Sequence, residues 1–309
     1  MTEPSTAIPF ESLESAVRNR LADLRDKPLA MYPTGLESVD EMLGGGIAAG
    51  EYGIIGARTS HGKTMFLLQW AYNVALQGHP CLVISAEMTK AALADRCMQF
   101  CSETAAAEWS TENGNAQAFD DAMAFLTTGR RPILLADSCL HVDKVAAAIS
   151  QAKTHHGCRF VVVDYLQRLR GCGNSRYEQV SYVSNMLASA AVENNVAVVA
   201  AAQLSRMSVT EAKEFVPKLH HLKESGDIEQ DADVIAFLAW PWKLDTKNKP
   251  GIYRIYGAKG RNRGIHGSGI CELSFDPKHQ RLSEREFGVT ERPNYEPAFA
   301  DYGGTQCEF

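Results

Sequence analysis

The segment 53–66 constrains the fold of this chain most strongly. It runs from a short apolar strand through a small-residue turn to Gly62-Lys63-Thr64, which opens an apolar-periodic helix. At such a junction the backbone N–H groups of the turn can face a polyphosphate, Lys63 can reach the outer phosphates, and Thr64 can offer a hydroxyl to Mg²⁺. The first glycine of the usual motif is replaced by Ala57. An ordinary strand-to-helix turn is therefore the alternative interpretation.

The composition is that of an ordinary soluble globular protein, since 45% of the 309 residues are hydrophobic and 22% are charged. A net charge of −6 gives no global attraction to nucleic acid, so such binding would need a local patch or a channel formed by assembly. The apolar runs are too short to span a bilayer, the polar start has no apolar leader, and the eight cysteines form no Cys-x-x-Cys pair. We expect a reduced, cytoplasmic protein with no membrane partner.

Three regions follow from the composition along the chain. Residues 1–30 form an N-terminal arm with an amphipathic linker helix over 10–26, residues 31–288 form the main domain, and residues 289–309 resemble a flexible tail. The helix carries large apolar residues at helical spacing: Phe10, Leu13, Val17, Leu21 and Leu24. This stripe must cover either its own core or a neighbouring subunit, and the sequence does not choose between them.

The main domain alternates buried strands with helices, which predicts an α/β fold with a mainly parallel, twisted sheet and helices on both faces. Three polar residues follow apolar strands: Glu87, Asp164 and Gln203. The carboxyl ends of parallel strands face the ligand crevice. Glu87 is therefore a candidate general base, with a helix N-terminal carboxylate as the alternative, and Asp164 can orient Mg²⁺ through its water shell.

Seven motifs in a fixed order then carry a family resemblance. They are Pro33-Thr34-Gly35, the loop 58–64, Ser85-Ala86-Glu87-Met88 followed by Leu93 and Arg96, Val163-Asp164-Tyr165-Leu166-Gln167, Ala202-Gln203-Leu204-Ser205-Arg206, the segment 224–233, and the segment 258–264. Together they resemble the motor domain of DnaB-type replicative DNA helicases, which implies a RecA-like P-loop NTPase core. The family shares the missing first glycine at Ala57. The chain departs from it at Lys223, where arginine is usual, at His61, where an apolar residue is common, and in having no counterpart of the N-terminal collar domain.

The resemblance implies roles for individual residues around ATP, or another NTP, and Mg²⁺. The nucleotide would be bound by Arg58, Ser60, His61, Gly62, Lys63, Thr64, Arg96 and Asp164. Thr64 would contact the metal and Asp164 would hold it through water, while Glu87 would activate the attacking water and Gln203 would sense the γ-phosphate. Arg261, together with Lys259, would be an arginine finger supplied to the neighbouring subunit. From the residues alone, a solvated hairpin loop after a strand over 251–257 is the alternative for these cations.

The same resemblance implies a DNA-binding channel and partners. The matching channel positions are Lys223, Glu224, Gly226 and Arg206, which suit sequence-independent contact with single-stranded DNA. The expected assembly is a homo-oligomeric, hexameric ring, with a helicase loader or a primase as further partners. Two other classes stay open: a recombination ATPase of the RecA or RadA type that forms filaments on DNA, and a regulatory ATP-binding assembly protein.

Overall fold

The computed structural model describes residues 11–26, 29–101, 120, 132–205, 216–222 and 226–285. Its strands are β1 (Met31–Tyr32), β2 (Ile47–Ala48), β3 (Tyr52–Ala57), β4 (Cys81–Ser85), β5 (Ile133–Asp137), β6 (Phe160–Asp164), β7 (Ala197–Gln203), β8 (Val234–Ala239), β9 (Ile252–Gly260), β10 (Ile270–Asp276) and β11 (Arg281–Glu284). Its α-helices are α1 (Leu13–Asp26), α2 (Glu37–Met42), α3 (Lys63–Leu76), α4 (Lys90–Cys101), α6 (Val142–His156), α7 (Arg176–Asn194), α8 (Gly226–Asp231) and α9 (Pro241–Leu244). Two 3₁₀ turns span Leu166–Arg168 and Leu219–His221.

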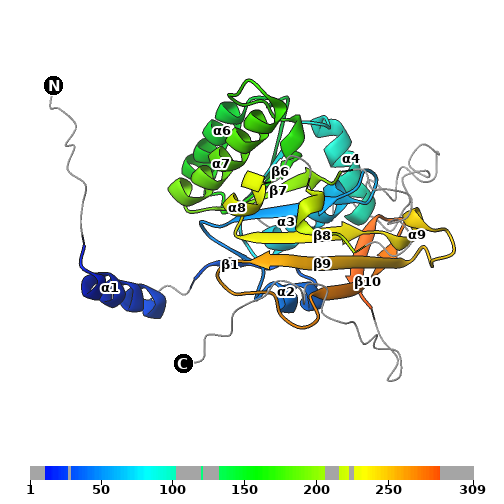
Figure 1. The fold of residues 1–309 in the computed structure, drawn as a ribbon, viewed down its shortest axis with the longest axis horizontal. Helices are drawn as coiled ribbons and strands as arrows, with labels where there is room; N and C mark the ends of the chain where they lie inside the picture. Colours follow the sequence, from blue (N-terminus) through cyan, green and yellow to red (C-terminus); the bar gives the residue numbers. More distant parts are fainter. Residues whose placement is uncertain are drawn as a thin grey trace.

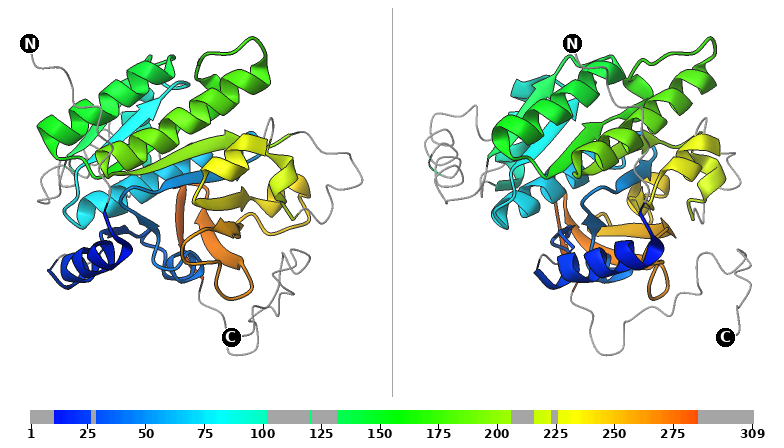
Figure 2. Two further views of the ribbon diagram at one scale, coloured as in Figure 1. Left: turned by 60° about the vertical axis from the view of Figure 1, so that its left-hand side comes forward. Right: turned by 90° about the vertical axis from the view of Figure 1, so that its left-hand side faces the viewer.

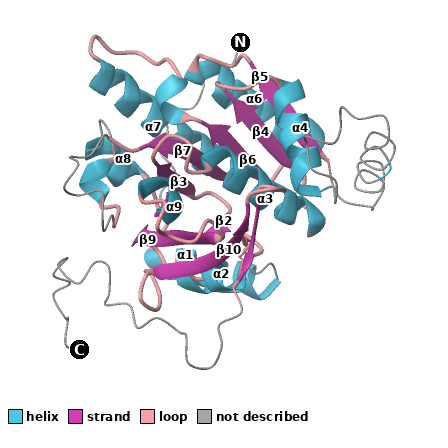
Figure 3. Ribbon diagram, turned by 90° about the vertical axis from the view of Figure 1, so that its right-hand side faces the viewer, coloured by secondary structure: helices cyan, strands magenta, loops and turns pink. Residues whose placement is uncertain are grey.

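The described strands form one large sheet in the order β11-β10-β9-β8-β3-β7-β6-β4-β5, while β1 and β2 pair separately. The strands from β8 to β5 in this order are parallel, and β9, β10 and β11 continue the sheet in antiparallel fashion. Figure 3 shows β9 and β10 beside the parallel strands. The expected α/β fold with a mainly parallel sheet is confirmed.

Helices cover both faces of the sheet, with α6 and α7 on one face and α2 and α3 on the other (Figure 2). Alternate residues of one strand point to opposite cores: Phe160 and Val162 of β6 pack with α3, and Val161 and Val163 pack with α6 and α7. This double burial is why the parallel strands are continuous apolar runs.

Helix α7 shows how local sequence sets an element boundary. Ser175 Oγ accepts from the N–H of Glu178 at 3.1 Å, and the Glu178 carboxylate accepts from the N–H of Ser175 at 3.2 Å. This capping box satisfies two backbone donors that the first turn leaves unpaired. The helix ends at Asn195, which adopts the left-handed conformation with φ 49°.

Helix α1 lies apart from the main body in Figure 1. Three of its apolar residues are largely exposed: Leu13 at 81%, Val17 at 48% and Leu21 at 63%. The stripe predicted from the sequence is thus not covered by this subunit at those positions. Phe10 and the tail 289–309 lie outside the described residues. Of the helices that the structure describes, none has both the length and the apolarity to cross a bilayer.

Candidate nucleotide site

The loop between β3 and α3 has the backbone shape of a phosphate-binding loop. Gly62 caps α3 in the left-handed conformation with φ 81°, and Ser60 has φ 65°. A side chain at Gly62 would also come within 3.0 Å of Met65 Cε and 3.1 Å of the Tyr253 hydroxyl oxygen. The left-handed conformation therefore favours glycine there, and a larger residue would also need these two side chains to shift.

Lys63 folds back over this loop. Its ammonium donates to the carbonyl oxygens of Ala57 and Arg58, at 3.3 Å each. Burial lowers the pKa of Lys63, and the carboxylates of Asp164 and Glu87 act in the opposite direction. The lysine thus lies at the loop together with both acids that the sequence places at strand ends.

Asp164 lies at the tip of β6 and faces the first turn of α3. Thr64 Oγ1 donates to Asp164 Oδ2 at 2.6 Å. The carboxylate is 1% exposed, and its other oxygen, Oδ1, has no hydrogen-bond partner among the described residues. Burial raises the pKa of Asp164, while the Thr64 hydrogen bond and the charges of Lys63 and Arg96 lower it. A hydroxyl beside a carboxylate oxygen without a partner is a donor set that suits a hydrated divalent cation.

Glu87 follows β4, which pairs with β6 so that Ser85 lies beside Asp164. The hydroxyl of Ser85 accepts from the N–H of Glu87 at 3.2 Å and of Met88 at 2.8 Å, which fixes the turn that presents Glu87. Glu87 is exposed, and its charge raises the pKa of Asp164.

Two side chains other than Glu87 bond backbone N–H groups at the start of α4. The hydroxyl of Thr89 accepts from the N–H of Ala92 at 3.3 Å, and Asp137 accepts from the N–H of Lys90 at 3.1 Å. Neither of these hydrogen bonds involves the side chain of Glu87.

Gln203 connects the tip of β7 to the phosphate-binding loop. Its side-chain amide donates to the hydroxyl of Thr59 at 3.0 Å. Its backbone N–H donates to the side-chain oxygen of Gln167 at 2.9 Å, and Gln167 returns a hydrogen bond to the carbonyl of Gln203 at 3.4 Å. A movement of Thr59 in the phosphate-binding loop would therefore act directly on β7 through the side chain of Gln203. Gln167 belongs to a motif quoted above, but nothing in the sequence shows its pairing with Gln203.

His61 supports the loop from behind and is only 4% exposed. Its Nδ1 accepts from the N–H of Trp240 at 3.0 Å, and its carbonyl accepts from the Tyr253 hydroxyl. Burial lowers the pKa of His61 to about 4, with help from the positive charges of Arg58, Lys63 and Lys243. The imidazole is thus neutral at physiological pH and is engaged with the end of β8. The remaining expected nucleotide-binding residues differ in exposure, since Arg58 and Arg96 are half-buried and Ser60 is exposed.

Lys259 and Arg261 lie at the other end of the sheet from this site. In the sheet register, Val234 pairs with Gly260 on one side and with Gly53, near the start of β3, on the other. Lys63 follows the opposite end of this six-residue strand, which spans roughly 17 Å. One subunit therefore does not bring Lys63 and Arg261 together.

Both cations are held in place by their own subunit. The ammonium of Lys259 donates to the carbonyl of Glu229 at 2.5 Å, and the guanidinium of Arg261 donates to Asp233 Oδ1 at 2.9 Å and to the carbonyl of Gln230. Strand β9 extends to Gly260, so Lys259 lies in the strand and not in a loop, which corrects the shorter strand expected over 251–257.

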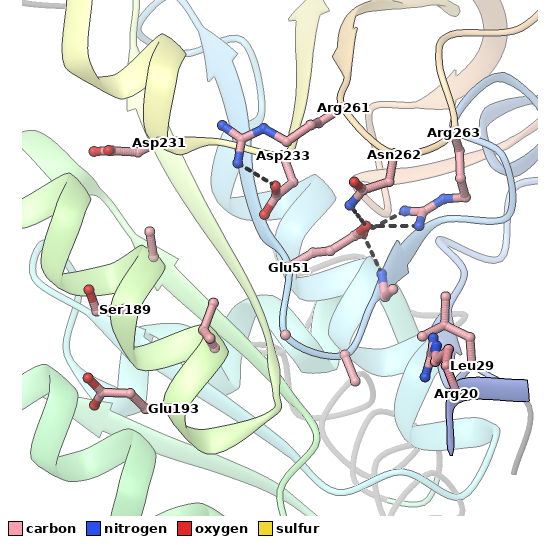
Figure 4. A pocket seen from close by; sticks show the side chains of 15 residues that line it. Arg20, Leu29, Glu51, Ser189, Glu193, Asp231, Asp233, Arg261, Asn262 and Arg263 are labelled. Atoms are coloured by element: carbon pink, nitrogen blue, oxygen red, sulfur yellow. Dashed lines mark hydrogen bonds and ion pairs between the residues drawn. The ribbon is translucent and has the colours of Figure 1, made fainter. Parts of the chain in front are cut away.

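Arg261 lines a cavity of about 690 Å³ between the start of β3, α7 and the hairpin after β9. Figure 4 shows its side chain directed toward Asp233, with Asn262 and Arg263 directed toward Glu51. Arg263 pairs with both oxygens of Glu51, at 2.8 and 2.5 Å, and Asn262 donates to the same carboxylate at 2.7 Å. These contacts lower the pKa of Glu51 against its burial and fix the hairpin on the body. No pattern in the sequence points to this role of Glu51.

The predicted DNA-binding positions are described only at Gly226, the first residue of α8. Arg206, Lys223 and Glu224 lie outside the described residues.

A phosphate-binding loop after a central parallel strand, with an acid at a nearby strand tip, defines a P-loop ATPase core with a RecA-like sheet. The chain belongs to the family of DnaB-like helicase C-terminal domains, whose family model matches residues 32–284. It is 33% identical over 281 residues to the replicative DNA helicase DnaB of Geobacillus stearothermophilus, and 33% identical over 287 residues to the replicative DNA helicase DnaC of Bacillus subtilis. These alignments cover 87% and 90% of this chain but 60% of each relative.

Solved structures agree with this assignment of the family. One of them, an isolated ATPase domain, superposes with a TM-score of 0.80 at 26% identity, over 90% of this chain and 100% of that one. A DnaB-like replicative helicase, described with its interactions with primase, superposes with a TM-score of 0.77 at 26% identity, over 91% of this chain and 69% of the other. The RecA-like fold and the resemblance to DnaB-type helicases are thus confirmed.

Proposed function

We propose that this chain is the motor of a ring-forming replicative DNA helicase, which hydrolyses ATP between adjacent subunits as it moves along single-stranded DNA and separates the duplex. Membership of the DnaB-like family supports this class of motor. The observation that carries the proposal is the separation of Lys63 and Arg261 to opposite ends of β3. A γ-phosphate held by Lys63 of one subunit can then meet Arg261 only from another subunit.

The nucleotide site would use the loop 58–62, Lys63 and Arg96 for the triphosphate. Thr64 and Asp164 fit Mg²⁺, because the unpartnered Asp164 Oδ1 can hold a metal-bound water beside the Thr64 hydroxyl. When bound, Mg²⁺ would neutralise charge on the transferring phosphoryl group. The nucleotide would be ATP and not another NTP, because a structural neighbour in this family is an ATPase domain.

Glu87 would accept a proton from the attacking water, since it is exposed and close enough to Lys63 and Asp164 to shift the pKa of both. Gln203 would report the state of the γ-phosphate, supported by its hydrogen bond to Thr59. Lys259 and Arg261 would stabilise the charge that develops in the neighbouring site.

Contact with DNA would come from Arg206, Lys223, Glu224 and Gly226 around a central channel. Binding through phosphates would be independent of sequence and would weaken as salt rises. The assembly would be a hexameric ring, in which α1 docks its exposed apolar stripe on the adjacent subunit. A helicase loader or a primase would be a further partner, and the primase named with one structural neighbour supports this choice.

The test is unwinding of a forked duplex with the length of each single-stranded tail varied in turn, together with electron micrographs of the assembly. The proposal expects unwinding that requires ATP and one of the two tails, by closed rings. Open filaments with strand-exchange activity would instead show a recombination ATPase. ATPase activity indifferent to single-stranded DNA would show a regulatory protein.

A further inference from the structure

Asp233 joins two parts of the subunit that the proposed function assigns to two different ATP sites. Its Oδ1 accepts from the guanidinium of Arg261 at 2.9 Å, and its Oδ2 accepts from the N–H of Tyr52 at 3.0 Å. Backbone hydrogen bonds link the same three residues. The N–H of Asp233 donates to the carbonyl of Tyr52 at 2.8 Å, and the N–H of Arg261 donates to the carbonyl of Asp233 at 2.7 Å. Tyr52 is the first residue of β3, the strand that ends at the phosphate-binding loop.

The contacts to Arg261 engage both terminal nitrogens of the guanidinium and still leave hydrogens for a further acceptor. Asp233 holds one terminal nitrogen, and the carbonyl of Gln230 holds the other. Each terminal nitrogen carries a second hydrogen, and 48% of the side chain is exposed, whereas that of Asp233 is 15% exposed. A long, flexible side chain held in this way is already ordered before it meets a phosphate, so less freedom is lost on contact.

We propose that Asp233 is a positioning residue for Arg261, which orients the guanidinium for the neighbouring subunit and ties that orientation to the start of β3 in its own subunit. The inference rests on the proposed action of Arg261 across the subunit boundary. Asp233 itself would contact neither the nucleotide nor the attacking water, because it lies near the end of β3 opposite the phosphate-binding loop. Its effect on hydrolysis passes through Arg261, and it therefore acts on the neighbour's site.

The first test is Asp233→Asn, which keeps an oxygen that can accept from Tyr52 and removes the charge that holds Arg261. Misplacement of a catalytic group by about 1 Å can cost about 100-fold, so we expect kcat to fall about 10- to 100-fold. The affinity for ATP, measured by equilibrium binding, should stay within a factor of about two of the parent, because the nucleotide site that contains Lys63 is unchanged. A kcat equal to or above the parent value would overturn the proposal, since Asp233 would then be neutral or would restrain Arg261.

The second test mixes Asp233→Asn subunits with Glu87→Gln subunits, under conditions where exchange of subunits is confirmed. Each Asp233→Asn site that receives Arg261 from a Glu87→Gln subunit should recover turnover. A structural defect that passed along β3 into the variant's own loop would prevent this recovery and would overturn the proposal.

A control mixture of Arg261→Ala with Glu87→Gln separates the inference from the function on which it rests. Lack of recovery in the control would contradict the proposed action of Arg261 in the neighbouring site, and with it the inference about Asp233. Recovery in the control without recovery for Asp233→Asn would contradict only the role of Asp233. If Asp233→Asn does not fold, Asp233→Glu displaces the carboxylate while keeping its charge, and the same loss of kcat and the same recovery on mixing are expected.

Discussion

Thr64 and Asp164 are one hundred positions apart in the chain, yet the hydroxyl of one lies 2.6 Å from the carboxylate of the other. The contact joins the first turn of α3 to the tip of β6, across the position of β7 in the sheet. Asp164 is buried with its second oxygen unpartnered among the described residues. Such a carboxylate costs stability in the absence of a cation, which suggests that it is kept for function.

We therefore expect Asp164→Asn to raise the thermal midpoint and to abolish Mg²⁺-dependent hydrolysis. The amide keeps an acceptor for Thr64 and carries no charge, so the free-energy cost of burying the side chain falls. Each kcal/mol gained should raise the thermal midpoint by about 2–4 °C. Burial raises the folded-state pKa of Asp164 above its unfolded value. Stability is therefore lost as the pH rises between these two values, and the gap between variant and parent should shrink in acid. Calorimetry without Mg²⁺ at pH 7 and pH 4 measures the thermal midpoint and its dependence on pH, and a steady-state ATPase assay measures the loss of hydrolysis. A variant less stable than the parent at pH 7 would contradict this account.

Lys63→Ala should reduce ATP hydrolysis by at least about 100-fold and leave the fold intact. Among the described residues the ammonium contacts only two backbone carbonyls, those of Ala57 and Arg58, so its loss removes a phosphate ligand and little packing. The measurement is steady-state ATPase with circular dichroism on the same samples. Lys249→Ala, at an exposed lysine near α9, is the matched control and should behave as the parent. Hydrolysis at the parent rate by Lys63→Ala would show that Lys63 does not bind the phosphates.

Glu87→Gln should bind ATP as the parent does and turn it over about 100-fold or more slowly, because an amide cannot accept the proton from water. Binding can be followed with a fluorescent ATP analogue, and turnover by release of phosphate in a single-turnover experiment. Glu41→Gln, at an exposed acid of α2, serves as the control. Normal turnover by Glu87→Gln would move the general base to another residue.

Subunits with Arg261→Ala and subunits with Glu87→Gln should each be inactive alone and should regain partial ATPase when mixed. Some interfaces of the mixed assembly then combine an intact acid with an intact arginine. Activity should pass through a maximum as the mixing ratio is varied. Absence of recovery at every ratio, with exchange of subunits confirmed, would show that Arg261 does not act in trans.

Deleting residues 1–28 should raise the protein concentration needed for assembly while leaving a folded core. Leu13, Val17 and Leu21 are exposed in the subunit, and each large side chain removed from water contributes roughly 1.5–3 kcal/mol. Sedimentation over a concentration series, with and without ATP and Mg²⁺, measures the shift. Leu13→Ser with Leu21→Ser should reproduce much of it, and Arg18→Ser, on the same helix, should not. Assembly of the truncated chain at the parent concentration would show that the stripe is not an interface.

The residues that could be predicted from the sequence are those whose position follows from one local pattern. Lys63 and Thr64 follow a strand and open a helix, and Asp164 closes an apolar run, so the pattern alone places each at the carboxyl edge of the sheet. The pairs that join distant segments could not be predicted, because they depend on sheet register. Asp233 meets Arg261 only because β9 runs three residues further than its apolar pattern indicates and is irregular opposite Ile235 and Ala236.

The placement of Lys63 and Arg261 near opposite ends of β3 also has a consequence for the symmetry of the proposed assembly. Two subunits related by a two-fold axis could complete both of their sites reciprocally, and such a dimer would offer no further contact of this kind to a third subunit. In the proposed ring, subunits would instead follow one another head to tail, and every contact between two subunits would complete one catalytic site. A closed ring then has as many complete sites as subunits, whereas an open chain always has one site that lacks its arginine and one arginine that serves no site.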